Sequence, residues 1–457
     1  MNKKVNTFKS RVLNASFWSV GGNITTQVIR FATNLIMTRF LVPEAYGLMA
    51  LAQVFIFGLH FFTDIGFGQN LIQNKRSDPA FVNTVFTMRA LNGCFVWTLS
   101  ILVALALAQF NRWGMFPKNS VYTDPMLPIL VVAVGFCSII GNFESTNLSL
   151  SVRNLSMKMN VSIRLLSQIL GLIVMVIFAY YYRSVWALVM GQAVASATQT
   201  ICSHQLIDGE KNQFHWDKSA VKDVFSFGKW IFFCSILAFF YSASDKLLLA
   251  GLVDAKTLGF YSIATLLAFA LKDLVTNLMS SVGFPSLSET YRERPESLKT
   301  VFYKLRIPID IVCMLLIGFI FAAANTIVEI LYDDRYISAG WMLQIFALIF
   351  FELRYKLSGE CFRAMGKPEI ITYFIMLDIA MLYAFGYFFF YWLGLKGIVL
   401  AFASSSIATI PLNLYYMHKF GILDVKREWL PLPLIPVGYG LGLLFVWLVN
   451  LLHFNIR

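Results

Sequence analysis

Apolar segments recur along the whole chain, and each is about as long as a helix needs to be to cross a bilayer. An ordinary soluble domain is about 45–50% apolar and about 25% charged. This chain of 457 residues is 58% hydrophobic and 14% charged. The sequence therefore predicts an all-α polytopic membrane protein and disfavours a soluble enzyme, a nucleic-acid module and a single-pass receptor. The predicted spans are 15–37, 45–70, 82–109, 126–148, 158–182, 184–206, 226–250, 257–282, 304–325, 338–360, 370–393, 396–418 and 432–453.

The net charge of +12 follows the predicted loops. With the N-terminus in the cytoplasm, the inside segments hold 21 Lys and Arg residues and the outside segments hold eight. Short loops rich in Lys and Arg stay in the cytoplasm. The bias predicts a cytoplasmic N-terminus, and it accounts for the positive charge without a nucleic-acid partner.

The two halves of the chain resemble each other. The segment LVPEAYGLMALA at 41–52 is similar to LVDAKTLGFYSIA at 252–264, with Gly47 and Gly259 in corresponding turns. Because six spans is an even number, both repeats would enter the membrane from the same side, as in some transporters. We expect two six-helix lobes around a central cavity and one extra C-terminal apolar segment. The expected divisions are an N-terminal lobe at 1–206, a cytoplasmic linker at 207–225, a C-terminal lobe at 226–418 and the extra segment at 419–457.

Polar side chains fall on single faces of several predicted spans. The first span carries Asn23, Gln27, Arg30 and Asn34 in steps of four, three and four residues. The second span carries Gln53, His60 and Asp64 on one face, and the sixth carries Gln192 and Gln199 among serines. Such stripes join helices or line a wet cavity, because an unpaired polar group in hydrocarbon costs several kcal/mol. For amides and hydroxyls both interpretations stay open.

Charged residues deep in the spans favour a cavity. Arg30 and Lys272 each lie about 15 residues into a span, or about 22 Å at 1.5 Å per residue, which is too deep for easy snorkelling. Ion pairing is the alternative for each charge, and the neighbours Asp245–Lys246 and Lys272–Asp273 are suited to it. Because the charges occur in both halves, we expect a central polar cavity.

Motifs of catalysis and metal binding are missing. The chain contains no GxxxxGK[ST], GxSxG or HExxH motif, its six cysteines form no CxxC, and its five histidines are dispersed. We expect no enzymatic activity, no cofactor and no metal.

Several segments, taken in order, are similar to bacterial polysaccharide transporters, the Wzx-like branch of the multidrug/oligosaccharidyl-lipid/polysaccharide exporter superfamily. The similarity runs from about residue 12 to residue 418. The segments include TRFLVPEAYGLMALAQ at 38–53, FFTDIGFGQNLIQ at 61–73, ASDKLLLAGLVDAKTLGFYSIA at 243–264, ILYDDRYISAGWMLQIFAL at 330–348 and FRAMGKPEI at 362–370.

The resemblance implies an alternating-access flippase of the bacterial inner membrane. It would move a polyprenyl-diphosphate-linked oligosaccharide to the outer leaflet, for a surface polysaccharide such as O-antigen, capsule or exopolysaccharide. Its expected partners are the lipid-linked oligosaccharide, membrane lipid, a polysaccharide polymerase and chain-length proteins. The thirteenth span departs from the twelve or fourteen that are more usual in relatives.

The family has no catalytic motif to transfer, so the expected site rests on the polar stripes. Arg30 is the first candidate for diphosphate contact, because its planar guanidinium matches phosphate oxygens, and Lys272 and Lys246 follow. The expected substrate-cavity residues are Arg30, Lys272, Lys246, Asn23, Gln27, Asn34, Gln192 and Gln199.

Two alternatives stay open. A cation-coupled multidrug antiporter of the same superfamily would use acidic residues, and Asp64 and Glu352 are the candidate coupling-ion sites. A non-transporting membrane component of glycan assembly is the second alternative.

Overall fold

The computed structural model describes residues 2–73, 76, 78–154 and 156–454. In this part of the chain all regular secondary structure is helical, which confirms the predicted all-α class. The chain divides into two compact units, residues 1–259 (unit 1) and residues 260–457 (unit 2). The division expected from the repeat places 226–259 in the second lobe, and that assignment stays a prediction.

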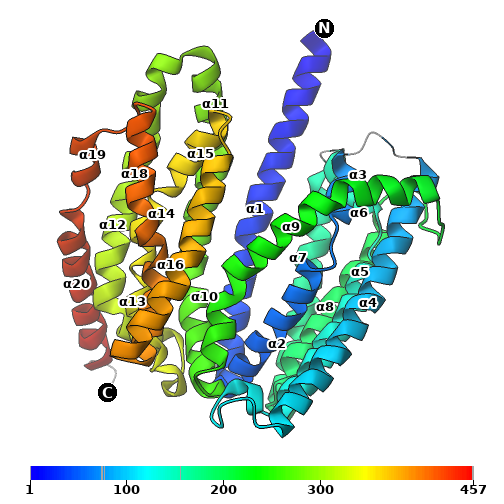
Figure 1. Ribbon diagram of the computed structural model, residues 1–457, viewed down its shortest axis with the longest axis horizontal. Helices are drawn as coiled ribbons and strands as arrows, with labels where there is room; N and C mark the ends of the chain where they lie inside the picture. Colours follow the sequence, from blue (N-terminus) through cyan, green and yellow to red (C-terminus); the bar gives the residue numbers. More distant parts are fainter. Residues whose placement is uncertain (1, 74–75, 77, 155, 455–457) are drawn as a thin grey trace. The chain divides into compact units, whose positions relative to one another are not determined.

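The described part of unit 1 contains nine α-helices, a 3₁₀ turn at Val121–Thr123 and the start of a tenth α-helix. In Figure 1, α9 runs obliquely, and it packs against α2 and α4. The helices are α1 (Asn2–Phe40), α2 (Pro43–Phe61), α3 (Phe67–Gln73), α4 (Pro79–Arg112), α5 (Met126–Asn142), α6 (Asn147–Arg153), α7 (Met157–Tyr182), α8 (Trp186–Gln205), α9 (Lys218–Ala250) and the first residues of α10 (Ala255–Leu278).

Unit 2 continues α10 and ends with the pair α19 and α20. A short π-helix, Met279–Gly283, follows α10, and a 3₁₀ turn, Ser405–Thr409, follows α17. The helices are α11 (Phe284–Glu293), α12 (Leu298–Leu331), α13 (Ala339–Phe346), α14 (Ile349–Leu353), α15 (Lys356–Ala364), α16 (Glu369–Leu393), α17 (Leu395–Ser404), α18 (Ile410–Lys419), α19 (Val425–Trp429) and α20 (Leu434–Phe454).

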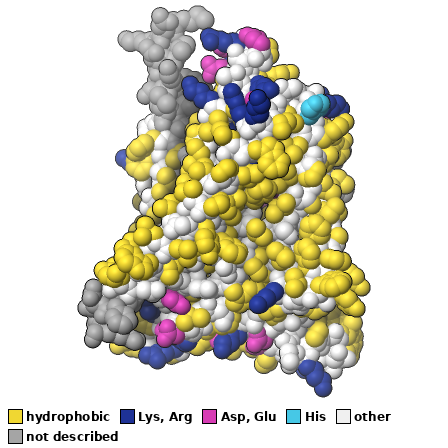
Figure 2. Space-filling model, turned by 90° about the vertical axis from the view of Figure 1, so that its left-hand side faces the viewer, with side chains coloured by type: hydrophobic (Ala, Val, Ile, Leu, Met, Phe, Trp, Pro, Cys, Tyr) yellow, Lys and Arg dark blue, Asp and Glu magenta, His cyan; other side chains and the backbone are white. Residues whose placement is uncertain are grey.

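The helices meet the requirements of a membrane protein. Eight of the described helices are long and apolar enough to cross a bilayer, and the bent pair α5–α6 would be a ninth. The other four predicted spans coincide with α1, α8, α9 and the series α13 to α15, in which 338–360 is broken into three short helices. On the face drawn in Figure 2, hydrophobic side chains form a broad band between two ends where charged side chains gather. The chain is a multi-pass membrane protein.

The linker before α9 is fixed to unit 1. The backbone N–H groups of residues 213, 215 and 217 donate to the side chains of Asn83, Thr87 and Thr84 on α4. Asp217 then caps α9, accepts from Ser219 and forms an ion pair of 3.2 Å with Arg76. The Ser219 hydrogen bonds and the Arg76 guanidinium lower the pKa of Asp217 to about 2. The first turn of α9 is therefore held at the N-terminal end of α4.

The two hairpins that look alike in the sequence contact each other through their glycines. A Cβ atom at Gly47 would overlap the carbonyl oxygen of Ala255, and one at Gly259 would overlap that of Pro43. Because glycine has no Cβ atom, the start of α2 and the start of α10 can pack backbone to backbone.

The last helix, α20, packs in parallel against α12. Gly438 lies against Leu315, Gly442 lies against Phe319, and the rings of Phe319 and Phe445 are 5.6 Å apart. The contacts advance in the same direction along both helices. The C-terminal ends of α20 and α12 therefore lie at the same end of unit 2, and the GxxxG sequence at 438–442 forms a helix contact.

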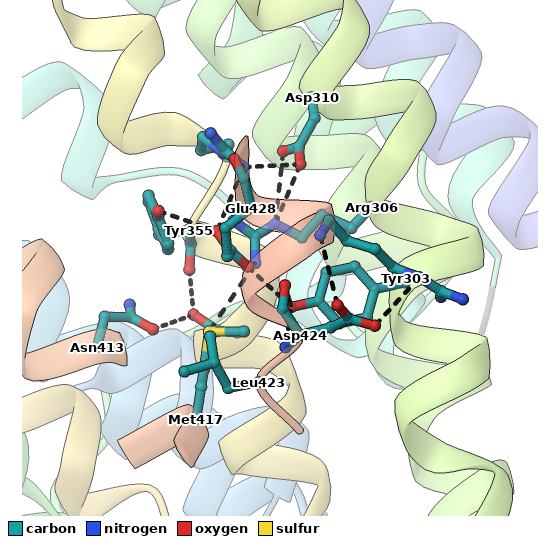
Figure 3. Close-up of polar contacts among 12 residues, drawn as sticks. Tyr303, Arg306, Asp310, Tyr355, Asn413, Met417, Leu423, Asp424 and Glu428 are labelled. Atoms are coloured by element: carbon teal, nitrogen blue, oxygen red, sulfur yellow. Dashed lines mark hydrogen bonds and ion pairs between the residues drawn. The ribbon is translucent and has the colours of Figure 1, made fainter. Parts of the chain in front are cut away.

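A buried ion cluster fastens α19 to the same helix (Figure 3). The cluster consists of Arg306 and Asp310 on α12, Arg354 after α14, and Glu428 on α19. The guanidinium of Arg306 forms two bonds with the Glu428 carboxylate, of 2.6 and 2.8 Å. Arg354 bridges Asp310 at 3.1 Å and Glu428 at 3.3 Å. Two positive and two negative charges therefore balance within the cluster.

Two tyrosines complete the coordination of Glu428. The hydroxyls of Tyr303 and Tyr355 donate to its two carboxylate oxygens at 2.8 and 3.0 Å. The ring of Tyr355 also lies 4.6 Å from the Arg306 guanidinium carbon, a cation–π contact. Each oxygen of Glu428 thus has more than one donor, as a carboxylate shielded from water requires.

Replacing Gly438 by Ala should destabilise the chain, because the added methyl group would collide with the α12 backbone. Overpacking typically costs about 1–3 kcal/mol. The matched control is Gly440→Ala on the same helix, where a Cβ atom meets nothing within 4 Å. Thermal unfolding in detergent should show a lower midpoint for G438A and no loss for G440A. Equal midpoints would contradict the described packing of α20 on α12.

Replacing Glu428 by Gln should also lower stability, because Arg306 and Arg354 would then share Asp310 alone. Breaking a buried ion pair by removing one partner costs about 3–5 kcal/mol. The exposed Glu296 provides the control E296Q, expected within about 0.5 kcal/mol of the parent. Denaturant unfolding in mixed micelles measures both. A wild-type midpoint for E428Q would show that the cluster does not hold α19.

Candidate functional site

A polar cavity lies inside unit 1, between α1, α2, α5, α8 and α9. Its volume is about 750 Å³, and we call it the unit 1 cavity. Its apolar wall comes mainly from α2 and α5. Its polar lining residues are Arg30, Gln53, His60, Ser138, Asn142, Gln192, Ser196, Ser242 and Lys246. No Asp or Glu is among the described residues that line it.

Two cations in this lining are not neutralised. Arg30 on α1 and Lys246 on α9 form no ion pair or hydrogen bond with any residue in the described part of the chain. Pairing between Lys246 and Asp245, the alternative that the sequence left open, is not among the ion pairs of the described residues, and Asp245 has other interactions. Two positive charges without a lining carboxylate make the cavity suited to an anion.

The structure brings together three of the eight expected cavity residues: Arg30, Gln192 and Lys246. Gln53 and His60, which share a predicted face of the second span, also line the cavity. This agreement follows from helical periodicity, since each stripe lies on the side of its helix that faces the cavity.

The other polar residues of α1 and α8 have different surroundings. Asn23 accepts a hydrogen bond of 3.0 Å from Arg164 on α7. Gln27 is half-buried and Asn34 is buried, and neither lines the unit 1 cavity. Gln199 donates to Glu144 at 2.7 Å, and Glu144 also pairs with Arg89 at 3.2 Å. These contacts join helices, which is the other interpretation of a polar stripe.

The Glu144 contacts belong to a break between α5 and α6, where the helix axis bends by 63°. A break exposes backbone groups that hydrocarbon cannot satisfy. Side chains of α8 supply the partners: Thr200 donates to the carbonyl of Ile140 at 2.7 Å, and Ser203 accepts from the N–H of Ser145 at 2.9 Å. The polar end of α8 therefore stabilises an irregular backbone.

The two candidate coupling-ion residues lie in separate surroundings. Asp64 follows α2, and its carboxylate accepts from the N–H groups of Gly66 and Phe67 at the start of α3, at 2.8 and 3.3 Å. Glu352 in unit 2 is buried and pairs with Lys356 at 3.2 Å. Both carboxylates have structural partners, and a role in ion coupling stays a prediction for each.

Lys272 lies in unit 2 on α10. Its ammonium group is 5.2 Å from the ring of Phe269, and it interacts electrostatically with Lys356, Glu352 and Asp378. Asp378 accepts a hydrogen bond of 2.8 Å from Ser406. Lys272 therefore belongs to a mixed-charge region of unit 2, in contrast to the cationic lining of the unit 1 cavity.

Sequence reasoning missed several residues. Ser138 and Asn142 line the cavity from α5, and Ser242 lines it from α9, but single hydroxyls and amides in apolar runs give little signal. Arg164 gave a stronger signal that was overlooked, since it is a basic residue inside the predicted span 158–182.

No group of three or more His, Cys, Asp or Glu residues placed to bind a metal ion occurs in the described part of the chain. The ion cluster of unit 2 is balanced internally, and it carries no free charge for a ligand. The unit 1 cavity is the candidate site.

Comparisons with known proteins agree with this architecture. The family described as "Polysaccharide biosynthesis protein" matches residues 36–340. The lipopolysaccharide biosynthesis protein WzxC of Escherichia coli (strain K12) is 20% identical over 460 residues, which covers 96% of this chain and 89% of WzxC.

Two solved structures share the fold. The lipid II flippase MurJ in an inward closed conformation has a TM-score of 0.65 at 13% identity, covering 96% of this chain and 100% of the MurJ chain. An inward-facing MATE-family multidrug resistance transporter of the MOP superfamily has a TM-score of 0.52 at 12% identity, covering 87% of this chain and 96% of that chain.

Proposed function

Because the chain belongs to the polysaccharide biosynthesis protein family, we propose that it is a flippase for a lipid-linked oligosaccharide. It would move a polyprenyl-diphosphate-linked repeat unit from the cytoplasmic to the outer leaflet of a bacterial inner membrane, for surface polysaccharide synthesis. The observation that carries the proposal is the unit 1 cavity, in which Arg30 and Lys246 have no partner, and no carboxylate lines the wall, among the residues that the structure describes.

The physical problem of such a flippase is desolvation. A sugar has many hydroxyls and a diphosphate is anionic, so crossing about 30 Å of hydrocarbon unaided is prohibitive. Amides and hydroxyls, such as Gln192 and Ser138, can replace the lost hydration of the sugar. Arg30 can bind phosphate oxygens in bidentate fashion, and Lys246 adds a second positive charge. The prenyl chain can remain in lipid.

Alternating access between two six-helix lobes is the proposed mode of movement. The repeat is supported by helices with matching ends in the two units. Helix α7 has 26 residues and is capped by Arg183, with φ of 45°; α16 has 25 residues and is capped by Gly394, with φ of 57°. These two positive-φ residues are separated by nearly the same interval as Gly47 and Gly259. Both intervals support duplication of the lobe, with Lys272 as a cavity residue of the second copy.

The multidrug antiporter is the principal alternative. A cavity for a cationic drug requires acidic residues, but the unit 1 cavity presents Arg30 and Lys246, and a like charge at a desolvated site costs several kcal/mol. Asp64 and Glu352 already have partners. The electrostatics of the cavity therefore favour the anionic lipid-linked substrate. A polymerase and chain-length proteins are proposed as functional partners, and we propose no catalytic activity.

Replacing either cation of the unit 1 cavity by Gln should abolish transport without unfolding the chain. In a strain lacking the chromosomal copy, R30Q and K246Q should leave lipid-linked repeat units in the cytoplasmic leaflet and reduce surface polysaccharide at least tenfold. The reason is that a hydrogen bond to a charged group contributes about 1.5–3 kcal/mol, and 1.4 kcal/mol corresponds to a factor of ten.

The control for this experiment is K256Q, which changes an exposed lysine outside the cavity. It should export normally, and all variants should reach wild-type levels in the membrane. Full export by R30Q and K246Q would reject the flippase. So would a deletion strain that keeps wild-type surface glycan but becomes sensitive to cationic dyes. Either result would favour the antiporter or a non-transporting component.

The proposed topology places the N-terminus in the cytoplasm. On a cysteine-free background, single cysteines at Asp78 and Trp216 should resist a membrane-impermeant thiol reagent in intact cells, whereas one at Asn119 should react. The Lys and Arg excess of the predicted inside loops is the reason. Because α20 runs parallel to α12, the C-terminus should then lie outside. Labelling at Trp216 but not at Asn119 would reverse the orientation.

A further inference from the structure

His60 stands on the wall of the unit 1 cavity, in the last turn of α2. Its Nε2 atom lies 2.9 Å from the hydroxyl oxygen of Ser138 on α5. Its Nδ1 atom has no hydrogen-bond partner among the described residues. One ring nitrogen is thus anchored by the protein while the other remains available to a ligand.

The partner of Nε2 permits two charge states. A serine hydroxyl can donate to a neutral imidazole nitrogen or accept from a protonated one, since it has one donor and two acceptor positions. A carbonyl or an ammonium partner would allow only one of these directions. His60 can therefore gain or lose a proton while its contact with Ser138 is kept.

Charged groups on several helices act on the imidazole. Arg30 on α1 and Lys246 on α9 line the same cavity as His60. Asp64, one turn along from His60, interacts with it electrostatically, and the imidazole also lies in the last turn of α2, at the negative end of the helix dipole. An unperturbed imidazole titrates at about pH 6.5, so modest changes in its surroundings switch its charge under physiological conditions.

The remaining neighbours do not supply a fixed charge. From α5, the cavity presents Cys137, Ser138 and Asn142, and from α8 it presents Gln192 and Ser196. The pair of Arg89 on α4 and Glu144 after α5 balances itself. The charge of a bound ligand would therefore add to the fixed charges of Arg30, Lys246 and Asp64 around His60.

We propose that His60 is a third, proton-dependent ligand for the anionic head group in the unit 1 cavity. In the empty cavity the two fixed cations keep the imidazole neutral. A bound diphosphate offsets those cations, and the imidazole then takes a proton from water and binds a phosphate oxygen as an imidazolium. When the head group leaves, the proton returns to water, and no covalent bond of the substrate forms or breaks.

This inference rests on the proposed function, because it assumes that the cavity binds a diphosphate. A suitable probe is farnesyl-diphospho-glucose, a diphosphate diester whose own charge does not change between pH 6 and pH 8. Isothermal titration calorimetry of the purified full chain in detergent, in buffers of low and high ionisation enthalpy, gives both the affinity and the number of protons taken up.

The wild-type chain should take up a fraction of one proton per bound probe molecule near pH 7. Linkage then requires tighter binding at lower pH, by up to about sixfold between pH 8 and pH 6 if the proton affinity of His60 rises tenfold. The variant H60Q keeps a partner for Ser138 without the titration, so it should bind weakly at both pH values with no proton uptake. H60K carries a fixed charge and should bind tightly at both.

The matched control is H204Q, which changes a histidine outside the cavity whose ring contacts the carbonyl of Phe143. It should behave as wild type. If H60Q does not fold, H60K still tests the inference through its loss of pH dependence. Proton uptake that persists in H60Q or H60K, or is absent in the wild type, would overturn the role of His60. Failure of the wild type to bind the probe at any pH would overturn the proposed function and this inference together.

Discussion

The cost of taking charge out of water governs the placement of the polar residues in this chain. In unit 2 the cost is offset by pairing, because Arg306 and Arg354 meet two carboxylates and every oxygen of Glu428 has donors. In unit 1, Arg89 pairs with Glu144, whereas Arg30 and Lys246 line a cavity and have no partner in the described part of the chain. Buried pairing and a polar cavity are thus two ways in which this chain accommodates basic residues.

Much of this arrangement could be predicted from the sequence. Of the thirteen spans predicted from hydrophobic length, eight match described helices that are long and apolar enough to cross a bilayer, and a ninth matches the bent pair α5–α6. Helical periodicity predicted that Arg30 and Gln192 would both line a polar cavity. The GxxxG spacing of Gly438 and Gly442 is visible in the sequence as a weak signal for helix packing, and the structure shows that α12 is its partner. These features depend on spacing within one helix, which a sequence displays directly.

Contacts between distant segments could not be predicted in the same way. Glu428 was not singled out at all, although it coordinates four side chains, because its partners lie more than 70 residues away. Gln199 belongs to the same stripe as Gln192, yet it meets Glu144 because a break in the neighbouring helix brings that carboxylate to it. His60 was placed on a polar face of the second span but not among the expected site residues, because the five histidines are dispersed in the sequence.

The hydrogen-bonded linker before α9 has a consequence for the order in which the protein is made. Residues 213, 215 and 217 are held by side chains of α4, which leaves the ribosome more than 100 residues earlier. As α9 emerges it can dock on helices that are already in place, so the first 259 residues can mature as one contiguous segment during synthesis. A nascent chain arrested near residue 259 would therefore retain every helix that lines the unit 1 cavity.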